Sequence, residues 1–372
     1  MRQETLSEEV LRRAVVSRFD FDQLLVVPLL AVVMALIIGG VIMLATGVGL
    51  ESIGRSYVAL FTGSLGSTYA ISETLTAAAP LTLAGLGIAL AFRAGLFNIG
   101  AEGQLLVGGM AAVIVGFSFE GVPAIIHLPL ALIAAALAGA VWAGIAGWLR
   151  AATGAHEVIT TIMLNLTSLR LVDYLLRNPP VQRPDRSDPI SRSVLDSAEL
   201  PHLLGWLDPV LRLHAGIILA VLAVVFVYWL LFRTTIGFEF RAAGLNPDAA
   251  RYAGMRAGLI IVMVMGLAGA LAGLAGANQV LGVLGRASPN FSGGIGFDAI
   301  AVALLGRSHP VGVLLAGVLF GALQAGGRQM QALAGVSLDL IGIIQALIII
   351  FIAAPMLVRA VVPWLFRRRI AG

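Results

Sequence analysis

The stretch 258-GLIIVMVMGLAGALAGLAGANQVL-281 decides the fold class of this chain. It contains no charged residue over 24 positions. A helix rises about 1.5 Å per residue, so this run can cross the ~30 Å hydrocarbon core of a bilayer. Its glycines and alanines are interspersed with larger apolar residues, a composition typical of helices that pack closely in lipid. The stretch therefore predicts a transmembrane helix.

Comparable apolar runs recur along almost the whole chain of 372 residues. The composition agrees, because 59% of the residues are hydrophobic, 12% are charged and the mean hydropathy is +0.96. Soluble domains carry about 25% charged residues. We therefore predict an all-α polytopic membrane helix bundle with about ten transmembrane segments, including broken or half helices. The predicted segments cover residues 24–47, 74–93, 103–118, 126–149, 156–176, 214–232, 258–281, 296–306, 310–327 and 338–358.

One predicted segment, 296–306, has too few residues to cross the membrane as a regular helix. Either the glycine-rich lead-in Ser292–Gly296 extends it, or the segment dips into the membrane and returns. Such broken helices are tolerated only where protein surrounds them.

Arginine placement predicts the topology. A transmembrane domain, 24–361, is flanked by an amphipathic segment, 1–23, and a basic tail, 362–372. Arginines concentrate in both flanks and in the loop 233–257. Because cytoplasmic loops are enriched in basic residues, we expect this loop and both the N- and C-termini in the cytoplasm. The proline-rich loop 178–213 is then extracytoplasmic, where it is either a landing surface for an external partner or a solvated connector.

Several kinds of chemistry are missing from the sequence. The chain has no cysteine, and all 24 of its basic residues apart from histidine are arginine. A P-loop needs a lysine to reach the nucleotide phosphates, so the chain does not hydrolyse ATP by that route. His156 and His309 lack the further ligands of a metal site, and we find no catalytic cluster. The arginines lie at membrane boundaries and form no single basic face, so nucleic acid is not an expected partner.

The loop 233-RTTIGFEFRAAGLNPDAARYAGMRAG-258 is the most informative segment outside the membrane. Asn246 can cap a helix that begins at Pro247 and ends before Gly254. The pattern predicts a short, rigid helix between two spans. On the residues alone, this is either a surface helix without a special role or an element that transmits movement to the bundle.

This segment resembles the cytoplasmic coupling loop of bacterial ABC permeases that import branched-chain amino acids, simple sugars and purine nucleosides. Two further stretches, 93-RAGLFNIGAEGQLLVGG-109 and 294-GIGFDAIAVALLGRSHPVG-312, resemble blocks of the nucleoside-type branch. The resemblance covers roughly residues 70–330. It implies that the ATPase coupling loop uses Gly237, Arg241, Ala242, Gly244, Asn246, Pro247, Ala250 and Gly254.

The resemblance also implies the setting of the protein. The chain would be a multi-pass permease subunit in the bacterial inner (plasma) membrane, working by alternating access. Its partners would be ABC ATPase subunits, a second and non-identical permease subunit, an extracytoplasmic solute-binding protein, membrane lipid and a small polar solute. The chain itself would bind no cofactor and no metal, because ATP and Mg²⁺ are used by the partner ATPase. The expected solute is a purine nucleoside, with a simple sugar as the alternative.

Polar residues within or beside the apolar spans are the candidates for the solute pathway. A charged residue at membrane depth normally faces a cavity or a partner. The pathway residues we predict are Phe97, Asn98, Glu102, Gln104, Asn165 and Asp298. Alternatively, residues 93–104 form a cytoplasmic turn with Arg93 and Glu102 in solvent, and the intramembrane amides bond only to neighbouring helices.

Two other classes of protein remain open on the residues alone. An ion-coupled secondary transporter or channel would need ionisable residues in its spans, for which Glu102, Glu157 and Asp298 are the candidates. A membrane-embedded enzyme would need a catalytic cluster that the sequence does not show.

Overall fold

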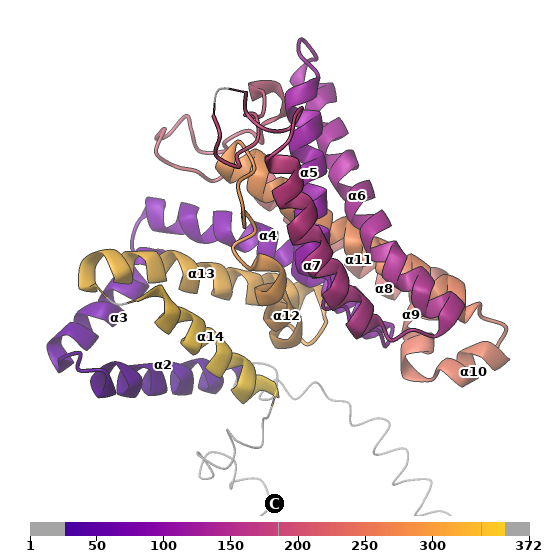
Figure 1. Ribbon diagram of the computed structural model, residues 1–372. Coiled ribbons are helices and arrows are strands. Elements are labelled where there is room, and N and C mark those ends of the chain that lie inside the picture. The colour runs from indigo at the N-terminus through magenta and orange to yellow at the C-terminus, as the bar shows by residue number, and fades with distance from the viewer. Residues whose placement is uncertain (1–26, 185, 336, 354–372) are drawn as a thin grey trace, which may run out of the picture. The chain divides into compact units, whose positions relative to one another are not determined.

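The computed structural model describes residues 27–184, 186–335 and 337–353, and their regular structure is helical (Figure 1). The longer helices are α2 (Val27–Ala45), α3 (Leu50–Leu65), α4 (Thr68–Arg93), α5 (Ala101–Ser118), α6 (Ala124–Thr153), α7 (Glu157–Leu176), α8 (Gly216–Arg233), α9 (Thr235–Leu245), α11 (Ala257–Gln279), α12 (Ile295–Leu305), α13 (Pro310–Ala334) and α14 (Leu338–Ala353). Short elements are η2 (Asp196–Ala198), α10 (Pro247–Tyr252) and the π-helical segment η3 (Val280–Leu284).

The prediction of an all-α polytopic bundle is confirmed. Seven helices are long and apolar enough to cross a membrane, and three shorter apolar helices accompany them. Two helices were not predicted. The first is α3, and the second is α9, which the sequence analysis left within the loop 233–257.

The described residues form two compact units, Arg55–Val336 and a smaller one built from the chain's two flanks. In the smaller unit α2 packs against α14, with Ala31, Met34 and Phe351 in its core. The predicted amphipathic segment 1–23 and the basic tail 362–372 lie outside the described residues.

Helix α4 is the centre of the larger unit. It packs against α8, α11, α12 and α13, and most of its residues are buried. Glycines allow these close contacts: an added Cβ at Gly87 would lie 2.5 Å from the Ala268 carbonyl oxygen of α11, and one at Gly321 would lie 2.5 Å from the Thr74 carbonyl oxygen. The small-residue spacing that the sequence shows along these helices therefore serves helix packing.

Helix α12 is a half helix inside the bundle. Its 11 residues rise only about 16 Å, about half of the hydrocarbon core. Irregular backbone with Gly293 and Gly294 at positive φ leads into it from η3, and a tight turn at Arg307 and Ser308 joins it to α13. Figure 1 shows this orange segment descending to α12. Of the two predicted alternatives, the lead-in does not extend the helix, so the segment is a broken span.

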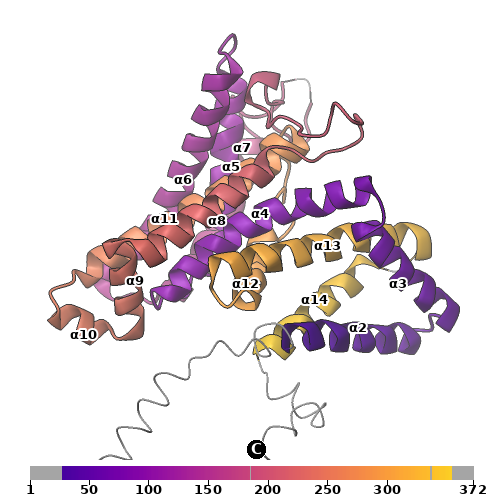
Figure 2. The ribbon, with the colours of Figure 1, turned by 180° about the vertical axis from the view of Figure 1, so that it is seen from behind.

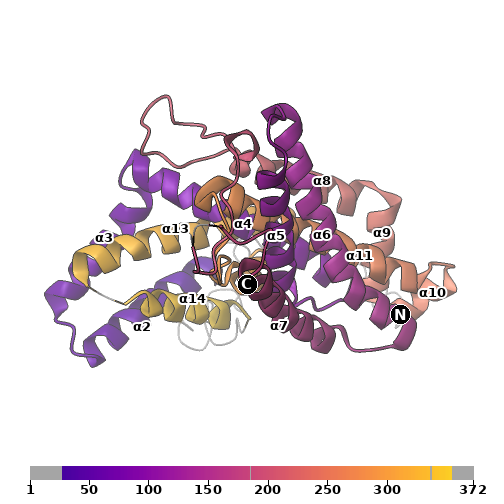
Figure 3. The same ribbon diagram turned by 45° about the horizontal axis from the view of Figure 1, so that its top comes forward.

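The two long loops lie at opposite ends of α4. Arg212, in the loop between α7 and α8, pairs with Glu73 near the first residue of α4, whereas Gly244 of α9 packs on the last residues of α4. Figure 3 shows the loop and the α9–α10 pair apart from each other. That the loops 178–213 and 233–257 face opposite sides of the membrane stays a prediction.

Candidate functional site

The turn between α4 and α5 carries two buried amides that bond to each other. Gly95 turns the chain with φ of +71° after α4 ends. The Asn98 Nδ2 donates to Gln104 Oε1 at 3.1 Å, and Gln104 Nε2 donates back to Asn98 Oδ1 at 3.0 Å. Asn98 Oδ1 also accepts from the Gly100 N–H at 2.9 Å. The pair therefore fixes the first turn of α5.

Glu102 joins the start of α5 to the start of α12. One of its carboxylate oxygens accepts from the Ser292 hydroxyl, and the other accepts from the Gly296 N–H at 2.8 Å. Gly296 is the second residue of α12, so the carboxylate satisfies a free N–H group at a helix N-terminus, where negative charge is stabilised. An added Cβ at Gly296 would overlap the Glu102 backbone. The half helix thus begins against Glu102.

Helix α7 supplies the remaining bonds to this turn. Asn165 Oδ1 accepts from the Gly103 N–H at 2.8 Å, and Asn165 Nδ2 donates to the Ile99 carbonyl at 2.9 Å. About two turns earlier in α7, Glu157 Oε1 accepts from the Phe97 N–H at 3.1 Å, and its other oxygen pairs with Arg150 of α6. Glu157 and Asn165 are eight residues apart and both buried, so they lie on one face of α7.

The structure brings all six predicted pathway residues together around the starts of α5 and α12. Asn98, Glu102, Gln104 and Asn165 are 1–4% exposed, so the alternative of a solvated turn is wrong for Glu102. Asp298 is half-buried and accepts from Gln324 Nε2 of α13 at 3.0 Å. The Phe97 ring is 44% exposed and stacks on Phe92 with centroids 4.9 Å apart. The four buried residues hold the helix starts in place, and their contact with solute stays a prediction.

The predicted helix after Asn246 is present as α10. Asn246 Oδ1 accepts from the Ala249 N–H at 3.0 Å, Pro247 is the first helical residue, and Gly254 has φ of +85° after the helix. Asn246 also ends α9, so the two helices meet at one residue. Leu245 is 89% exposed and Tyr252 is 95% exposed. The pair is therefore a rigid projection with apolar side chains at its tip.

Helix α9 is fixed to the bundle by glycines. An added Cβ at Gly237 would overlap the Leu230 carbonyl of α8, and one at Gly244 would overlap the Arg93 carbonyl. The Arg241 guanidinium lies 5.3 Å from the centre of the Phe232 ring, a cation–π contact. These three predicted coupling residues thus connect α9 to α8 and to the end of α4.

Arginine and histidine side chains gather at this end of the larger unit. Arg93 Nε donates to the Ser308 carbonyl at 2.9 Å and so connects α4 to the turn after α12. His309 packs against Phe232 and Tyr228, with ring centroids 5.5 and 5.9 Å apart. Burial and the nearby Arg93 charge lower the pKa of His309, which favours its neutral form.

An ion-pair cluster that was not predicted lies at the other end of α4. Glu73 is buried, and Arg212 donates to it through Nε at 2.9 Å and through Nη2 at 2.5 Å. Arg328 of α13 adds a contact of 3.3 Å. A carboxylate directly before the predicted span 74–93 was the available signal. Its partners lie 139 and 255 residues further along the chain, which no local pattern indicates.

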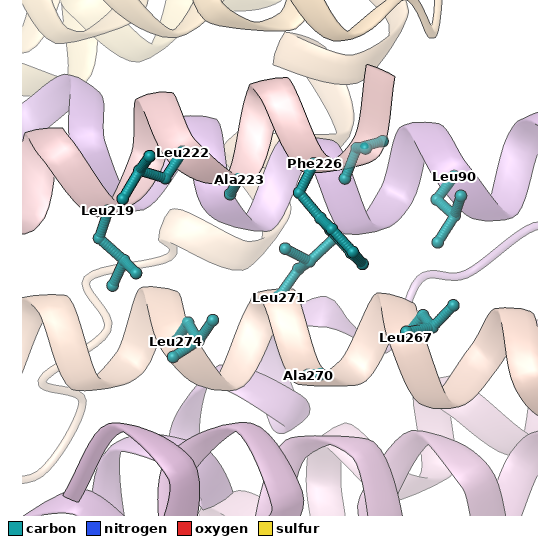
Figure 4. Close-up of a pocket in the computed structure, with 10 residues that line it drawn as sticks. Leu90, Leu219, Leu222, Ala223, Phe226, Leu267, Ala270, Leu271 and Leu274 are labelled. Carbon is teal, nitrogen blue, oxygen red and sulfur yellow. The ribbon is translucent and has the colours of Figure 1, made fainter. Parts of the chain in front are cut away.

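A groove lies between α4, α8 and α11. It holds about 270 Å³. Figure 4 shows Leu219, Leu222 and Phe226 of α8 opposite Leu267, Leu271 and Leu274 of α11. Every side chain that lines it is apolar. A polar solute would lose its hydrogen bonds to water here without replacement, so the groove does not suit one.

Metal ligands do not cluster in this molecule as far as the structure describes it: residues 27–184, 186–335 and 337–353 hold no group of three or more His, Asp or Glu side chains placed to bind an ion.

Membrane-spanning helices around a half helix, with a stiff helix pair outside them, define a multi-pass membrane transport protein. The family model described as the permease component of the branched-chain amino acid transport system matches residues 70–353, and the chain belongs to this family. It is therefore a permease subunit of an ABC transporter in the plasma membrane, a transport component and not a catalytic enzyme.

Similar proteins are known from several organisms. The chain is 45% identical to the guanosine ABC transporter permease NupP of Bacillus subtilis, over 91% of this chain and 95% of that one. It is 42% identical to the glucose permease TsgB13 of Haloferax volcanii, over 87% and 86%. It is 37% identical to the nucleoside permease NupB of Lactococcus lactis, over 91% and 93%. A second, less similar permease matches in each of these three organisms. The guanosine permease NupQ of Bacillus subtilis, for example, is 28% identical to this chain. No solved structure matches the chain.

Proposed function

We propose that the chain imports purine nucleosides as one of two non-identical permease subunits of its transporter. The observation that carries the proposal is its similarity to a guanosine permease and a nucleoside permease over 91% of its length in both cases. A simple sugar is the second candidate solute, because a glucose permease is 42% identical. The non-identical partner is supported by the pairs of unequal matches, such as NupP at 45% and NupQ at 28%.

In this proposal α9 and α10 couple the permease to separate ATPase subunits on the cytoplasmic side. Coupling requires a stiff element, because a flexible loop would absorb the movement. The α9–α10 pair meets this need, since Asn246 joins the helices directly and Gly244 packs on the end of α4. The exposed tip residues Leu245 and Tyr252 suit a docking groove, as apolar anchors of a short helix do. ATP and Mg²⁺ would be bound by the ATPase, and this chain would bind no cofactor.

The solute pathway in this proposal runs past the start of α12. Half helices whose ends meet inside the membrane mark the binding sites of many transporters. Glu102, Asn98 and Asn165 supply carboxylate and amide groups there, and Asp298 and Phe97 lie at the more exposed edge. The second permease would complete the pathway on that edge. A solute-binding protein would deliver solute to the loop 178–213, at the other end of α4.

Transport by the reconstituted complex tests the proposal. Proteoliposomes with both permeases, the ATPase and the binding protein should accumulate guanosine only with ATP, and an uncoupler should not abolish uptake. Uptake of glucose but not guanosine would refute the nucleoside assignment. Uptake without ATP that the uncoupler abolishes would refute ATPase coupling.

Docking can be tested separately with matched surface variants. Leu245→Asp should abolish co-purification of the ATPase while membrane insertion stays normal. The control is Leu207→Asp, which changes a leucine that is 57% exposed in the loop at the other end. It should retain the ATPase. Normal co-purification with Leu245→Asp would contradict the docking role of α9 and α10.

A further inference from the structure

Three buried side chains that carry polar atoms without a hydrogen-bond partner lie in the half of the larger unit that carries the loop 178–213. Asn278 is 0% exposed, His214 is 1% exposed and Thr76 is 5% exposed. Within the described residues, neither amide atom of Asn278 has a partner, and the same is true of His214 Nε2 and Thr76 Oγ1. Buried polar groups are nearly always bonded, so each exception calls for an explanation.

His214 and Asn278 lie against the same glycine. An added Cβ at Gly216, the first residue of α8, would overlap Asn278 Nδ2 and lie 2.7 Å from His214 Cε1 and Nδ1. An added Cβ at Gly282, in the π-helical segment, would also meet the imidazole, with Nδ1 at 2.6 Å. The two polar groups therefore meet where α8 begins and α11 ends, and only glycine at these positions leaves room for them.

Thr76 lies on the face of α4 that contacts the loop before α8. One turn earlier, Ser72 Oγ accepts from the Leu213 N–H at 3.0 Å. Residues four apart lie on one face of a helix, so Thr76 follows Ser72 along the face that contacts the chain at Leu213 and His214. Helices α4 and α11 and the end of the loop before α8 thus each carry one side chain with an unsatisfied polar atom in this part of the bundle.

The hydrogen-bonding capacity of the cluster can be assigned. His214 Nδ1 accepts from the Gly216 N–H at 3.2 Å, so in the neutral ring the hydrogen lies on Nε2. Burial, followed by the charges of His202 and Arg212, lowers the pKa of His214 to about 4, and the ring is neutral at pH 7. The cluster therefore offers an N–H donor from His214, both a donor and an acceptor from Asn278, and a hydroxyl from Thr76.

The backbone beside the cluster is built differently from a regular helix. Residues Val280–Leu284 form a π-helical turn, a feature found often at functional sites. The outer loop bonds to this turn, because the Leu200 N–H donates to the Leu281 carbonyl at 3.0 Å and the Val194 N–H donates to the Gly285 carbonyl at 2.9 Å. Figure 2 shows the loop gathered at this end of α11. Movement of the loop therefore reaches the residues next to Asn278.

We propose that Thr76, His214 and Asn278 form a solute-binding site on the outer half of the transport path, which takes the hydrogen-bonding edge of a nucleobase. A purine edge presents adjacent donors and acceptors, and an asparagine amide can bond to two of them at once. The site is closed in this structure, and displacement of the outer loop opens it through the π-helical turn. The inference rests on the proposed nucleoside transport.

The test measures the KM for uptake in the reconstituted complex. Asn278→Leu keeps the volume and removes both amide groups, and Thr76→Val removes only the hydroxyl. We expect the KM for guanosine to rise about tenfold with Asn278→Leu and about threefold with Thr76→Val. The matched control is Thr82→Val, because Thr82 is another buried α4 threonine whose Oγ1 lacks a partner within the described residues but faces Gly317 of α13. Its KM should stay within twofold.

Comparison of solutes separates the possible ligands. Guanosine, inosine and adenosine share the ribose and differ in the base edge, so unequal losses across them support the assignment. Equal losses would place the contacts on the ribose and overturn it. Unchanged KM values in both variants, with higher thermal stability of Asn278→Leu, would show a purely structural cluster and also overturn it. If Asn278→Leu fails to assemble, Thr76→Val decides. A wild-type complex that does not transport nucleosides refutes the proposed function instead.

Discussion

The contact between Gly244 and the end of α4 is the point at which the coupling role can be tested most directly. Helix α9 approaches α4 so closely that an added Cβ at Gly244 would overlap the Arg93 carbonyl and lie 2.8 Å from the Ala94 carbonyl carbon. These neighbours are backbone atoms, which cannot rotate away. From Ala94 the chain continues into the α4–α5 turn, which contains Phe97 and Asn98. The contact at Gly244 therefore connects α9 to that turn.

The size of the effect follows from two opposing terms. Alanine in place of glycine stabilises a helix by about 1 kcal/mol. Forcing a methyl group into a filled contact costs about 1–3 kcal/mol. Because the overlapping atoms at Gly244 are backbone, the cost there lies in the upper part of this range, at about 2–3 kcal/mol. The net loss with Gly244→Ala is therefore about 1–2 kcal/mol. This corresponds to about a five- to thirtyfold loss in the population of the coupled arrangement.

The control is Gly258→Ala in the first turn of α11, where the nearest atom to the added Cβ is the Ala151 Cβ at 3.6 Å, an ordinary contact. In proteoliposomes, Gly244→Ala should lower guanosine uptake by the stated factor while the complex still assembles and hydrolyses ATP at the basal rate. Gly258→Ala should transport like the wild type. Wild-type uptake by Gly244→Ala would show that α9 does not transmit movement through α4.

Further changes have expected outcomes of their own. Glu102→Ala leaves the Ser292 hydroxyl and the Gly296 N–H without their acceptor and should destabilise the larger unit by about 2–6 kcal/mol. Glu102→Gln should destabilise it less. Thermal unfolding of the purified variants measures the difference, and equal unfolding temperatures would contradict it. Asn246→Ala removes the cap of α10 and should cost about 1 kcal/mol, seen as about fivefold faster hydrogen exchange of Pro247–Tyr252. The folded-state pKa of His214 is about 4 and lies below the ordinary value of 6.5, because burial disfavours the charged ring. Between pH 6.5 and 4 the unfolded chain therefore binds a proton that the folded chain does not. The free energy of unfolding is highest above pH 6.5 and should fall by about 3 kcal/mol as the pH falls to 4. His214→Gln should not show this fall.

Local patterns were sufficient for most of the fold. A run such as 258–281 predicts a span because length and apolarity alone determine whether a helix can cross a bilayer. The helix after Asn246 was equally predictable, because its cap, its first residue and the glycine that follows it are all neighbours in the sequence. The half helix at 296–306 was recognisable from its length. In each case the physical cause acts within a few turns of chain.

The elements that were missed depend on distant partners or on mixed composition. Helix α3 contains Glu51 and Arg55 and is less apolar than the other long helices, so no apolar run marks it. Helix α4 begins at Thr68, earlier than the predicted start at 74, because distant arginines neutralise Glu73. The role of the predicted pathway residues toward solute stays a prediction. The sequence could not show that Glu102 bonds to the start of α12, because 194 residues separate Glu102 from Gly296.

Helix α4 has a property that alternating access requires: firm attachment at both ends. In its first turns, Ser72 bonds to Leu213 and Glu73 bonds to Arg212 of the loop 178–213. At its last residue, Arg93 bonds to the turn after α12. The stretch of α4 from Ser72 to Arg93 rises about 32 Å. Most of the residues of α4 are buried, so we expect the helix to move as a unit. In the proposed coupling, a displacement applied by α9 at one end of α4 would then reach the loop 178–213 at the other end. Helices α6 and α7 are not needed to transmit this displacement, since only 22% of the apolar stretch of each is buried.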